Sequence, residues 1–385
     1  MTKFIVATLL IFLLLIWLAY RETLHRRKTK EWAKKHVQNN NIPYQKAIDR
    51  LREKPKKLQS ASDAPIFQTE NSLNASLPED LQNFTLIRPG MIDEETFVLA
   101  SEIVDCIKRP HSALQALTRN ITPEELIDVL HGCPDITAKI LTTVNSAAFG
   151  LSQPITSINH AVIYLGLSIV KSIATQFIIK QSMNSTDKNQ KKAYKKLWQA
   201  AYLTSSLSFL SAQSLSKINA AELSTKALLS TIGCFAITCY KPELASLYTE
   251  EHSLIKRIEA EQSKLGLNAY IIGNLLAKKW KLPQNMIESI THSTFPLKYN
   301  KSTQAFTTEQ KHDLVFCYLM CRLGEEITYQ KLKRVEDLHF NELASSEYFY
   351  LQEALEDTEL TSCIKLFNNP TFVKKANQII LQSRM

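Results

Sequence analysis

The segment between Pro134 and Gly166 constrains the fold of this chain more than any other part of it. Its first part carries apolar side chains about one helical turn apart, which predicts a helix with one buried stripe. These side chains are Ile136, Ile140, Leu141 and Val144. Gly150 then supplies the positive φ that a turn after a helix favours. Ser157 is placed to cap a second helix that ends at Gly166, and Ser168 is placed to cap a third.

Composition supports an all-α fold. The chain of 385 residues has only eight glycines, and no two of them lie two or five positions apart. This spacing excludes both the Gly-x-Gly fingerprint of dinucleotide-binding folds and the phosphate loop of P-loop enzymes. Long apolar stripes with helical spacing, and few alternating β-branched runs, predict helices rather than strands.

A pattern of ten residues accompanies the predicted helices and turns. They are Asn145, Ser146, Ala147, Phe149, Gly150, Pro154, Ser157, Ala161, Leu165 and Gly166. The pattern resembles the opening half of an HDOD domain, an all-helical module related to HD-type phosphohydrolases that acts as a signalling output. The resemblance covers roughly residues 95–325 and implies a two-part helical bundle in a bacterial protein. It departs at Cys133-Pro134, where the family often has an Asp-Pro pair. We interpret the ten residues as structural, with the Asn145 amide locking the turn rather than contacting a ligand.

The resemblance also indicates where a catalytic metal would be held. Related hydrolases bind it through His and Asp side chains from neighbouring helices. The corresponding positions here carry Ala200, Ser230, Thr231 and Asn268, which are poor replacements for imidazole and carboxylate ligands. His292 is left alone, and we interpret it as a partly buried, hydrogen-bonded helix residue. His312-Asp313 repeats the HD dipeptide, but we interpret Asp313 as the start of a helix. We therefore expect no catalytic residue, no metal site and no cofactor.

The position of the charge argues against a nucleic-acid partner. The formal net charge is +9, and a basic domain surface would favour nucleic acid. However, residues 1–57 contain 14 Lys or Arg and four acidic residues, a net charge of +10, whereas residues 58–385 contain 32 and 33, a net charge of −1. We therefore expect no nucleic-acid partner. The seven cysteines include no Cys-x-x-Cys pair, which indicates a reducing compartment and no zinc site.

The apolar run from Phe4 to Tyr20 predicts a single N-terminal membrane-spanning helix. A cleaved signal peptide is the alternative, but the run exceeds the usual apolar length of about 7–15 residues, and no small-residue cleavage site follows it. Seven basic residues crowd its C-terminal flank, and clustered Lys and Arg stay on the cytoplasmic side. We expect a single-pass protein of the bacterial inner membrane with its globular part in the cytoplasm.

These observations divide the chain into five parts. Residues 1–21 form the anchor, 22–57 form basic juxtamembrane helices, 58–90 form a linker, 91–325 form the HDOD domain, and 326–385 form a C-terminal helical extension. The basic helices either lie on anionic lipid or stand as a solvated stalk. The extension either packs back on the second bundle or docks a partner.

The favoured hypothesis is a non-enzymatic, membrane-tethered regulatory protein whose HDOD domain binds a protein partner in a signalling pathway. Two alternatives stay open. One is a degenerate HD-type phosphohydrolase acting on a nucleotide, and the other is a pseudoenzyme that binds a nucleotide in the vacated pocket without hydrolysing it. The hypothesis depends on likeness of fold, which names a class of protein rather than a partner or a ligand.

Overall fold

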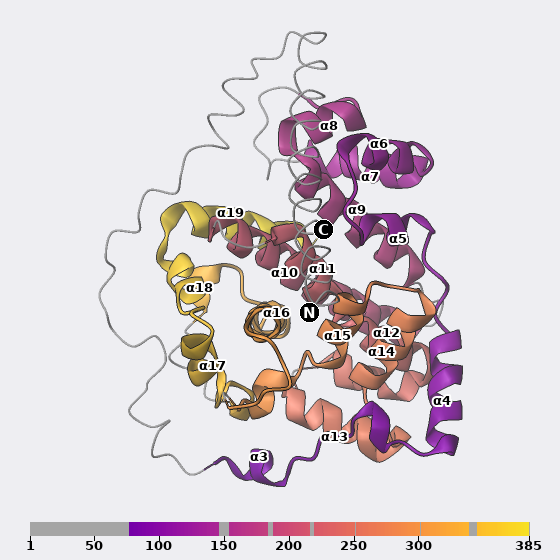
Figure 1. Ribbon diagram of the computed structural model, residues 1–385, viewed down its shortest axis with the longest axis vertical. Helices are drawn as coiled ribbons and strands as arrows, with labels where there is room; N and C mark the ends of the chain where they lie inside the picture. The colour runs from indigo at the N-terminus through magenta and orange to yellow at the C-terminus, as the bar shows by residue number, and fades with distance from the viewer. Residues whose placement is uncertain are drawn as a thin grey trace, which may run out of the picture.

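The computed structural model describes residues 77–145, 154–183, 188–215, 219–250, 252–300, 302–338 and 345–384. Every regular element within these ranges is a helix, which confirms the all-α expectation (Figure 1). The expected anchor at residues 1–21, the basic segment at 22–57 and most of the expected linker lie outside the described residues. Four residues of the ten-residue pattern also lie outside them: Ser146, Ala147, Phe149 and Gly150.

The helices follow one another in a simple order. The first part of the described chain contains α3 Glu79–Asn83, α4 Glu94–Asp105, α5 Ala113–Leu117, α6 Pro123–His131, α7 Pro134–Val144, α8 Ile158–Leu165 and α9 Leu167–Ser182. The second part contains α10 Lys188–Ser214, α11 Ala220–Leu229, α12 Ile232–Tyr240, α13 Leu254–Leu265, α14 Ala269–Lys279, α15 Gln284–Thr291, α16 Thr308–Tyr329, α17 Leu351–Asp357, α18 Ser362–Lys365 and α19 Pro370–Gln382. Short 3-10 helices join them at η2 Pro89–Met91, η4 Pro242–Tyr248, η5 Phe295–Lys298, η6 Val335–Asp337, η8 Ser346–Tyr348 and η9 Leu366–Asn368.

Local sequence explains where α8 and α9 begin. Ser157 caps α8 as expected, because its hydroxyl accepts a hydrogen bond from the amide of His160. The expected cap of α9 at Ser168 is wrong. Gly166 occupies the cap position instead, with φ 90° and ψ 157°, and the helix begins at Leu167. Because only glycine adopts this positive φ without strain, one residue both ends α8 and redirects the chain into α9.

The start of α16 also differs from the prediction. The helix begins at Thr308 rather than at Asp313. Thr307 and Gln310 form a capping box in which each side chain accepts a hydrogen bond from the other residue's backbone amide. The cap residue Thr307 lies six residues before Asp313, which therefore sits inside the helix.

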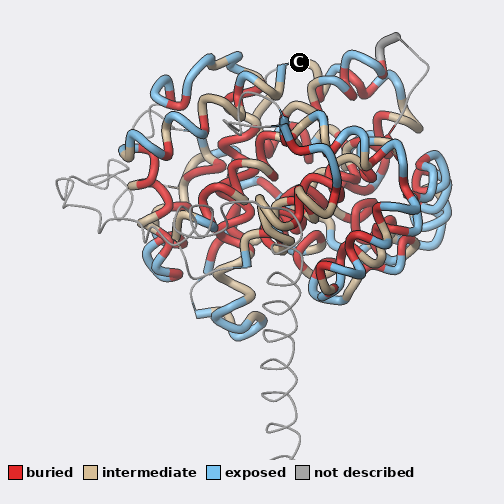
Figure 2. The backbone as a smooth tube through the Cα atoms, turned by 90° about the horizontal axis from the view of Figure 1, so that it is seen from above, coloured by how far each residue is buried: buried red, intermediate tan, exposed pale blue. Residues whose placement is uncertain are grey.

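The helices enclose two hydrophobic cores, in agreement with the expected two-part bundle. The first core lies between α4 to α9 and the pair α12 and α14, and the second lies between α10, α11, α13 and α16 to α19. α10 joins the two, because Leu197 packs into the first core and Leu207 packs into the second. α16 runs through the centre of the second group, surrounded by other helices (Figure 1). Figure 2 shows the buried residues gathered in the interior of the molecule.

Two expected domain boundaries are displaced. Leu81 and Phe84, which the sequence analysis placed in the linker, are buried in the second core, so packed structure begins before residue 90. The boundary expected at residue 325 falls inside α16. The region after α16 packs back on the second core through buried apolar side chains that include Tyr348, Leu351, Leu366, Phe367 and Phe372. It is therefore an integral part of the globular body.

Among the described residues, one stretch is long and apolar enough to cross a membrane, Ala220–Tyr240. It comprises α11 and α12, and 83% of its apolar window is buried inside the protein. Since these side chains already pack against other helices, we assign the stretch to the core of the domain.

Candidate functional site

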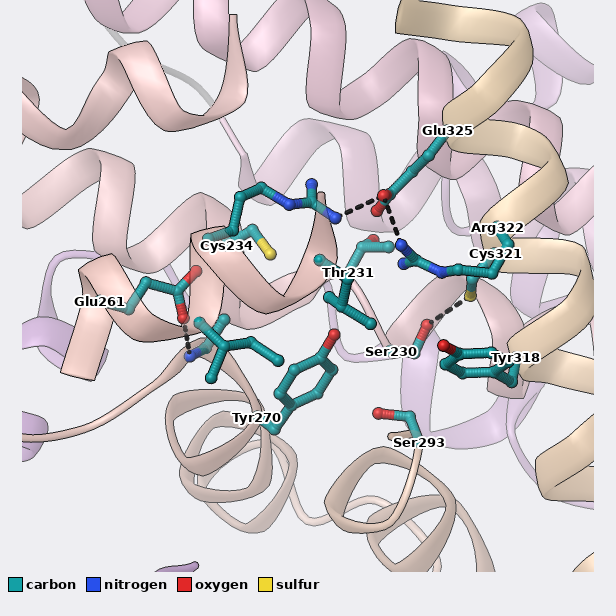
Figure 3. A pocket seen from close by; sticks show the side chains of 14 residues that line it. Ser230, Thr231, Cys234, Glu261, Tyr270, Ser293, Tyr318, Cys321, Arg322 and Glu325 are labelled. Atoms are coloured by element: carbon teal, nitrogen blue, oxygen red, sulfur yellow. Dashed lines mark hydrogen bonds and ion pairs between the residues drawn. The ribbon is translucent and has the colours of Figure 1, made fainter. Parts of the chain in front are cut away.

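A small pocket lies where the junction of α11 and α12 meets helices α13, α14 and α16 (Figure 3). Its space for water-sized molecules is about 20 Å³, room for roughly one or two waters. Two arginines and two glutamates line it: Arg257, Glu261, Arg322 and Glu325. Ser230 and Thr231 line it as well, so the pocket occupies the place where the resemblance locates the HD pair.

A buried ion-pair network forms one wall of the pocket. The carboxylate of Glu325 accepts hydrogen bonds from Nη2 of Arg257 and from Nη1 of Arg322, the latter at 3.0 Å (Figure 3). Arg322 also lies 3.5 Å from the carboxylate of Glu347, which accepts a 2.6 Å hydrogen bond from the amide of Leu254. Both arginines are only 4% exposed. The network therefore ties α13, α16 and the segment after α16 together.

Burial and neighbouring charge set the ionisation of the two pocket glutamates differently. Burial opposes the ionisation of Glu325, but the two guanidinium groups outweigh it and lower the pKa of this carboxyl group. For Glu261, burial dominates and raises the pKa. Its carboxylate accepts hydrogen bonds of 2.7 Å from the Tyr248 hydroxyl and from the Ala269 amide. Glu325 thus acts as an anionic bridge, whereas Glu261 fastens α13 to the start of α14.

Each pocket arginine retains an unused donor. The Nε atoms of Arg257 and Arg322 have no hydrogen-bond partner within the described part of the chain. An unpaired buried donor costs about 1–3 kcal/mol, and ordered water in the adjacent space would satisfy it. The pocket as it stands therefore suits water or a small polar group.

The residues at the HD-pair positions serve the backbone. Ser230 donates a 2.7 Å hydrogen bond to the carbonyl of Ala227, and Thr231 donates a 2.9 Å hydrogen bond to the carbonyl of Leu228. Ser230 also contacts the thiol of Cys321 at 3.1 Å. Ser230 ends α11 and Thr231 precedes α12, so both hydroxyls are committed to the turn between these helices.

Ala200, the third of these positions, lies in a close helix contact. It is 3% exposed on α10 and faces Gly324 of α16. A Cβ added to Gly324 would overlap the Thr204 hydroxyl and lie 2.9 Å from the carbonyl oxygen of Ala200. Small residues at this crossing let the two helix backbones approach, so Ala200 lies in a tightly packed part of the protein.

Asn268, the fourth of the positions at which the resemblance places metal ligands, is buried at the start of α14 and hydrogen-bonded on both sides of its amide. Its side-chain oxygen accepts hydrogen bonds from the amides of Tyr270 and Ile271. Its side-chain nitrogen donates to the carbonyl of Ile87 at 2.8 Å and to Oε1 of Gln262 at 3.0 Å. The residue is fully buried and is not part of the pocket lining. It therefore joins three segments rather than facing a ligand.

We expect Asn268→Ala to lower the free energy of unfolding by roughly 2–3 kcal/mol, because it removes a helix cap and leaves buried groups unpaired. Asn369→Ala is the matched control. The Asn369 side chain also accepts hydrogen bonds from the amides two and three residues further on, at the start of α19, but it is only half-buried. We expect its free energy of unfolding to fall by about 1 kcal/mol. Thermal unfolding of the full chain in mild detergent measures both. Equal losses would contradict the role of Asn268 in joining three segments.

The two histidine predictions need correction. His292 is exposed rather than partly buried, and its ring packs against Phe306 with 4.9 Å between ring centroids. The neighbouring Ser293, not His292, lines the pocket. Asp313 is not at a helix start: its carboxylate lies 2.5 Å from the buried ammonium group of Lys226 and fastens α16 to α11.

Asn145 locks the connection that follows α7. Its side-chain nitrogen donates to the carbonyls of Leu141 and Ile155 at 2.8 and 2.7 Å, and its oxygen accepts from the Ile155 amide at 2.7 Å. The residue is exposed, yet its amide makes all three bonds to backbone. Of the remaining described residues of the pattern, Pro154 is exposed, Ala161 is fully buried, Leu165 is half-buried and Gly166 has φ 90°.

The sequence analysis missed the charged wall of the pocket. The sequence signal that could have indicated this wall is a charged residue inside an apolar helical stripe. Arg257 stands between the buried Leu254 and Ile258, and Arg322 stands between Cys321 and Leu323. A buried charge must be paired, so such positions mark a network even when the partner is distant in sequence.

Comparison with known proteins agrees with this architecture. The described elements form an all-helical bundle around this pocket. A family model described as HDOD domain matches residues 99–296, just over half of the chain. The chain therefore belongs to the HDOD domain family. No curated protein matches it.

Solved structures with this fold are distant in sequence. An HDOD domain protein of unknown function from Geobacter sulfurreducens is 17% identical, with 74% of this chain and 98% of that chain covered and a TM-score of 0.52. A protein provisionally named as a signal transduction protein, from Marinobacter aquaeolei VT8, is 15% identical, with 79% and 63% covered and a TM-score of 0.51. One provisionally named as a phosphohydrolase, from Shewanella amazonensis SB2B, is 17% identical, with 73% and 97% covered and a TM-score of 0.48. The first two likenesses support the fold alone.

Proposed function

We propose that this chain is a non-enzymatic signalling protein, tethered to the bacterial inner membrane, whose cytoplasmic HDOD domain binds a protein partner. One observation carries the proposal: Ser230 and Thr231 use their hydroxyl groups to bind backbone carbonyls at the HD-pair positions. Neutral hydroxyls are poor ligands for a catalytic transition metal. Asn268 and Ala200 are likewise taken up by capping and packing.

The size of the pocket favours protein binding over nucleotide sensing. Pockets for small molecules measure roughly 300–1,000 Å³, whereas this one offers water-sized molecules about 20 Å³. To admit a nucleotide, the contacts of Arg257 and Arg322 with Glu325 would have to open. These contacts are buried and charged, so breaking them is costly.

An exposed apolar surface supports a protein partner, and we propose that the partner binds there. Met91, Phe97 and Val98 are 60%, 49% and 54% exposed on η2 and α4. α4 lies at the edge of the molecule (Figure 1) and carries no basic residue but four acidic ones: Glu94, Glu95, Glu102 and Asp105. Apolar side chains within a polar rim are typical of protein interfaces. A partner that presents apolar side chains among basic ones fits this surface.

We expect Phe97→Glu to reduce recovery of the partner at least about tenfold, because a carboxylate would be buried at the centre of the interface. Phe97→Leu keeps an apolar side chain and is the matched control. Crosslinking in bacterial membranes, followed by purification and mass spectrometry, measures recovery against the wild-type chain. The proposal is contradicted if Phe97→Glu retains the partner, or if residues 1–76 alone recover the same protein.

Two further measurements separate the alternatives from this proposal. Metal-dependent turnover of a nucleotide by the purified chain, lost in His292→Ala, would favour the phosphohydrolase. A nucleotide that raises the melting temperature would favour the nucleotide-sensing pseudoenzyme, because a ligand that binds only the folded state stabilises it.

A further inference from the structure

The sequence between Ile136 and Ala221 has a one-sided charge composition. It contains nine lysines, no arginine and a single acidic residue, Asp187. The described residues of α8, α9 and α10 carry no acidic side chain, whereas α4 carries four. The near-neutral total of the domain therefore conceals an uneven distribution of charge, with four acids and no basic residue on α4 and lysines without acids on α9 and α10.

Cations and aromatic rings alternate along this side. Lys139 lies 5.8 Å from the ring centroid of Phe177, Lys180 lies 5.1 Å from that of Trp198, and Lys196 lies 5.8 Å from that of Tyr329. The contacts run from α7 through α9 and α10 to the end of α16. Successive contacts share helices α9 and α10.

Lys196 lies at the α16 end of this series of contacts. Its ammonium group donates a 3.0 Å hydrogen bond to the carbonyl of Thr328, which holds it against α16. Burial lowers the pKa of Lys196, and so do its charged neighbours, which are all cations: Lys331, Arg384, Lys192 and Lys195. Arg384 donates a 3.2 Å hydrogen bond to the carbonyl of Lys331. Within the described ranges, none of these cations forms an ion pair with an acidic side chain.

The basic face is defined as Lys180, Lys192, Lys195, Lys196, Lys331 and Arg384. We propose that the basic face docks the domain on an anionic phospholipid surface. The proposal rests on the membrane tether of the proposed function, since an anchored domain stays within reach of the lipid at a high effective concentration. Clustered lysines near a bilayer are attracted by anionic headgroups, and individually weak contributions add.

The side chains of the face fit lipid better than nucleic acid. Five of the six cations are lysines. Arginine can bind a phosphate through two parallel hydrogen bonds, whereas the compact ammonium group of lysine cannot. The rings of Trp198 and Tyr329 are half-buried and lie under lysines, so they offer no open platform on which bases could stack. Leu381, which is 59% exposed one helical turn before Arg384, is an apolar side chain that can enter the headgroup region.

Lysine labelling tests the proposal on the full chain in two kinds of nanodisc. One kind contains only phosphatidylcholine, and the other contains phosphatidylcholine with phosphatidylglycerol. Reaction with an amine-specific acylating reagent, followed by mass spectrometry, gives the labelling rate of each lysine. We expect Lys192 and Lys195 to react about tenfold more slowly in the anionic discs at low salt. This protection should disappear in 0.5 M salt, because the electrostatic screening length is then only on the order of 4 Å. Lys278 and Lys281, exposed at the end of α14, should react equally in both.

A charge reversal gives a second readout. Lys192→Glu/Lys195→Glu should abolish the protection of Lys180 in anionic discs, whereas the matched variant Lys278→Glu/Lys281→Glu should leave it intact. Both pairs of side chains are exposed, so neither variant removes a packing contact. Unchanged melting temperatures in detergent establish that both variants fold.

The outcomes separate this proposal from the tether on which it rests. Insertion into both discs with equal labelling of Lys192 overturns lipid docking and leaves the tether standing. If the chain fails to insert into either disc, the tether is overturned. Flotation of the chain with phosphatidylglycerol vesicles but not with phosphatidylcholine vesicles would then support lipid docking without a tether. If a DNA oligonucleotide protects Lys192 in phosphatidylcholine discs while phosphatidylglycerol gives no protection, the face binds nucleic acid and lipid docking is overturned.

Discussion

Gly233→Ala is expected to lower the melting temperature by roughly 6 °C or more, because the crossing of α12 and α14 leaves no room for a methyl group. A Cβ on Gly233 would overlap the carbonyl oxygen of Ala269 and lie 2.9 Å from the backbone nitrogen of Gly273. Both are backbone atoms, so no change of rotamer relieves the clash and the helices must separate. Such overpacking costs about 3 kcal/mol, and the higher helix propensity of alanine offsets only about 1 kcal/mol of it.

Gly132→Ala provides the control for this expectation. Gly132 ends α6 with φ −73°, and a Cβ there would make an ordinary 3.5 Å contact with the carbonyl oxygen of Val129. Its melting temperature should stay within about 2 °C of the wild type. Thermal unfolding of the full chain in mild detergent measures both variants. A Gly233→Ala protein as stable as the control would show that α12 and α14 do not cross so closely.

The glycine also shows how much the sequence could tell about the fold. Nothing in the local pattern around Gly233 indicated a close helix crossing, whereas the structure shows it in the crossing with α14. Helices with one apolar stripe were predictable, since their periodicity is local. The cap at Ser157 was predictable for the same reason.

Helix starts with competing signals were harder to predict. Ser168 is a good capping residue by type, but Gly166 two positions earlier already sets the chain direction. Likewise, Asp313 suits a first turn, but Thr307 and Gln310 form a stronger start before it. Residue type gives a preference at each position, and only the packed structure decides which preference is satisfied.

The pocket wall could not be predicted from local pattern at all. Arg257 and Glu325 are 68 positions apart, and nothing in the sequence near either residue identifies the other. Charge raises a similar difficulty. A net charge of −1 after residue 57 argued against a nucleic-acid partner, yet the sum contains no information on how acids and lysines are distributed over the surface. The basic face became visible only when α10, α16 and α19 were placed together.

Glu325→Gln is expected to lower the free energy of unfolding by roughly 3 kcal/mol or more, because it removes the charge that bridges two buried guanidinium groups. Glutamine has nearly the same shape, so the variant isolates charge from packing. Arg257 would lose its ionic partner, and Arg322 would keep only Glu347 at 3.5 Å. Glu336→Gln is the matched control. Glu336 pairs with Arg334 on an exposed surface, where solvent screens the interaction. The melting temperature of the Glu336→Gln protein should therefore not differ from that of the wild type.

The pH dependence of Glu325→Gln distinguishes a lost charge from a general loss of packing. The pKa of Glu325 is lowered in the folded protein, because its two arginines outweigh the burial that opposes ionisation. A lowered pKa contributes stability above the ordinary range of glutamate, about pH 4.3, and this contribution is lost as the pH falls through the folded pKa. The difference in melting temperature between wild type and Glu325→Gln should therefore be largest near neutral pH and shrink as the solution is acidified. A difference that stays constant with pH would contradict an ionised Glu325, and the stability of this wall would then have to come from shape and hydrogen bonding alone.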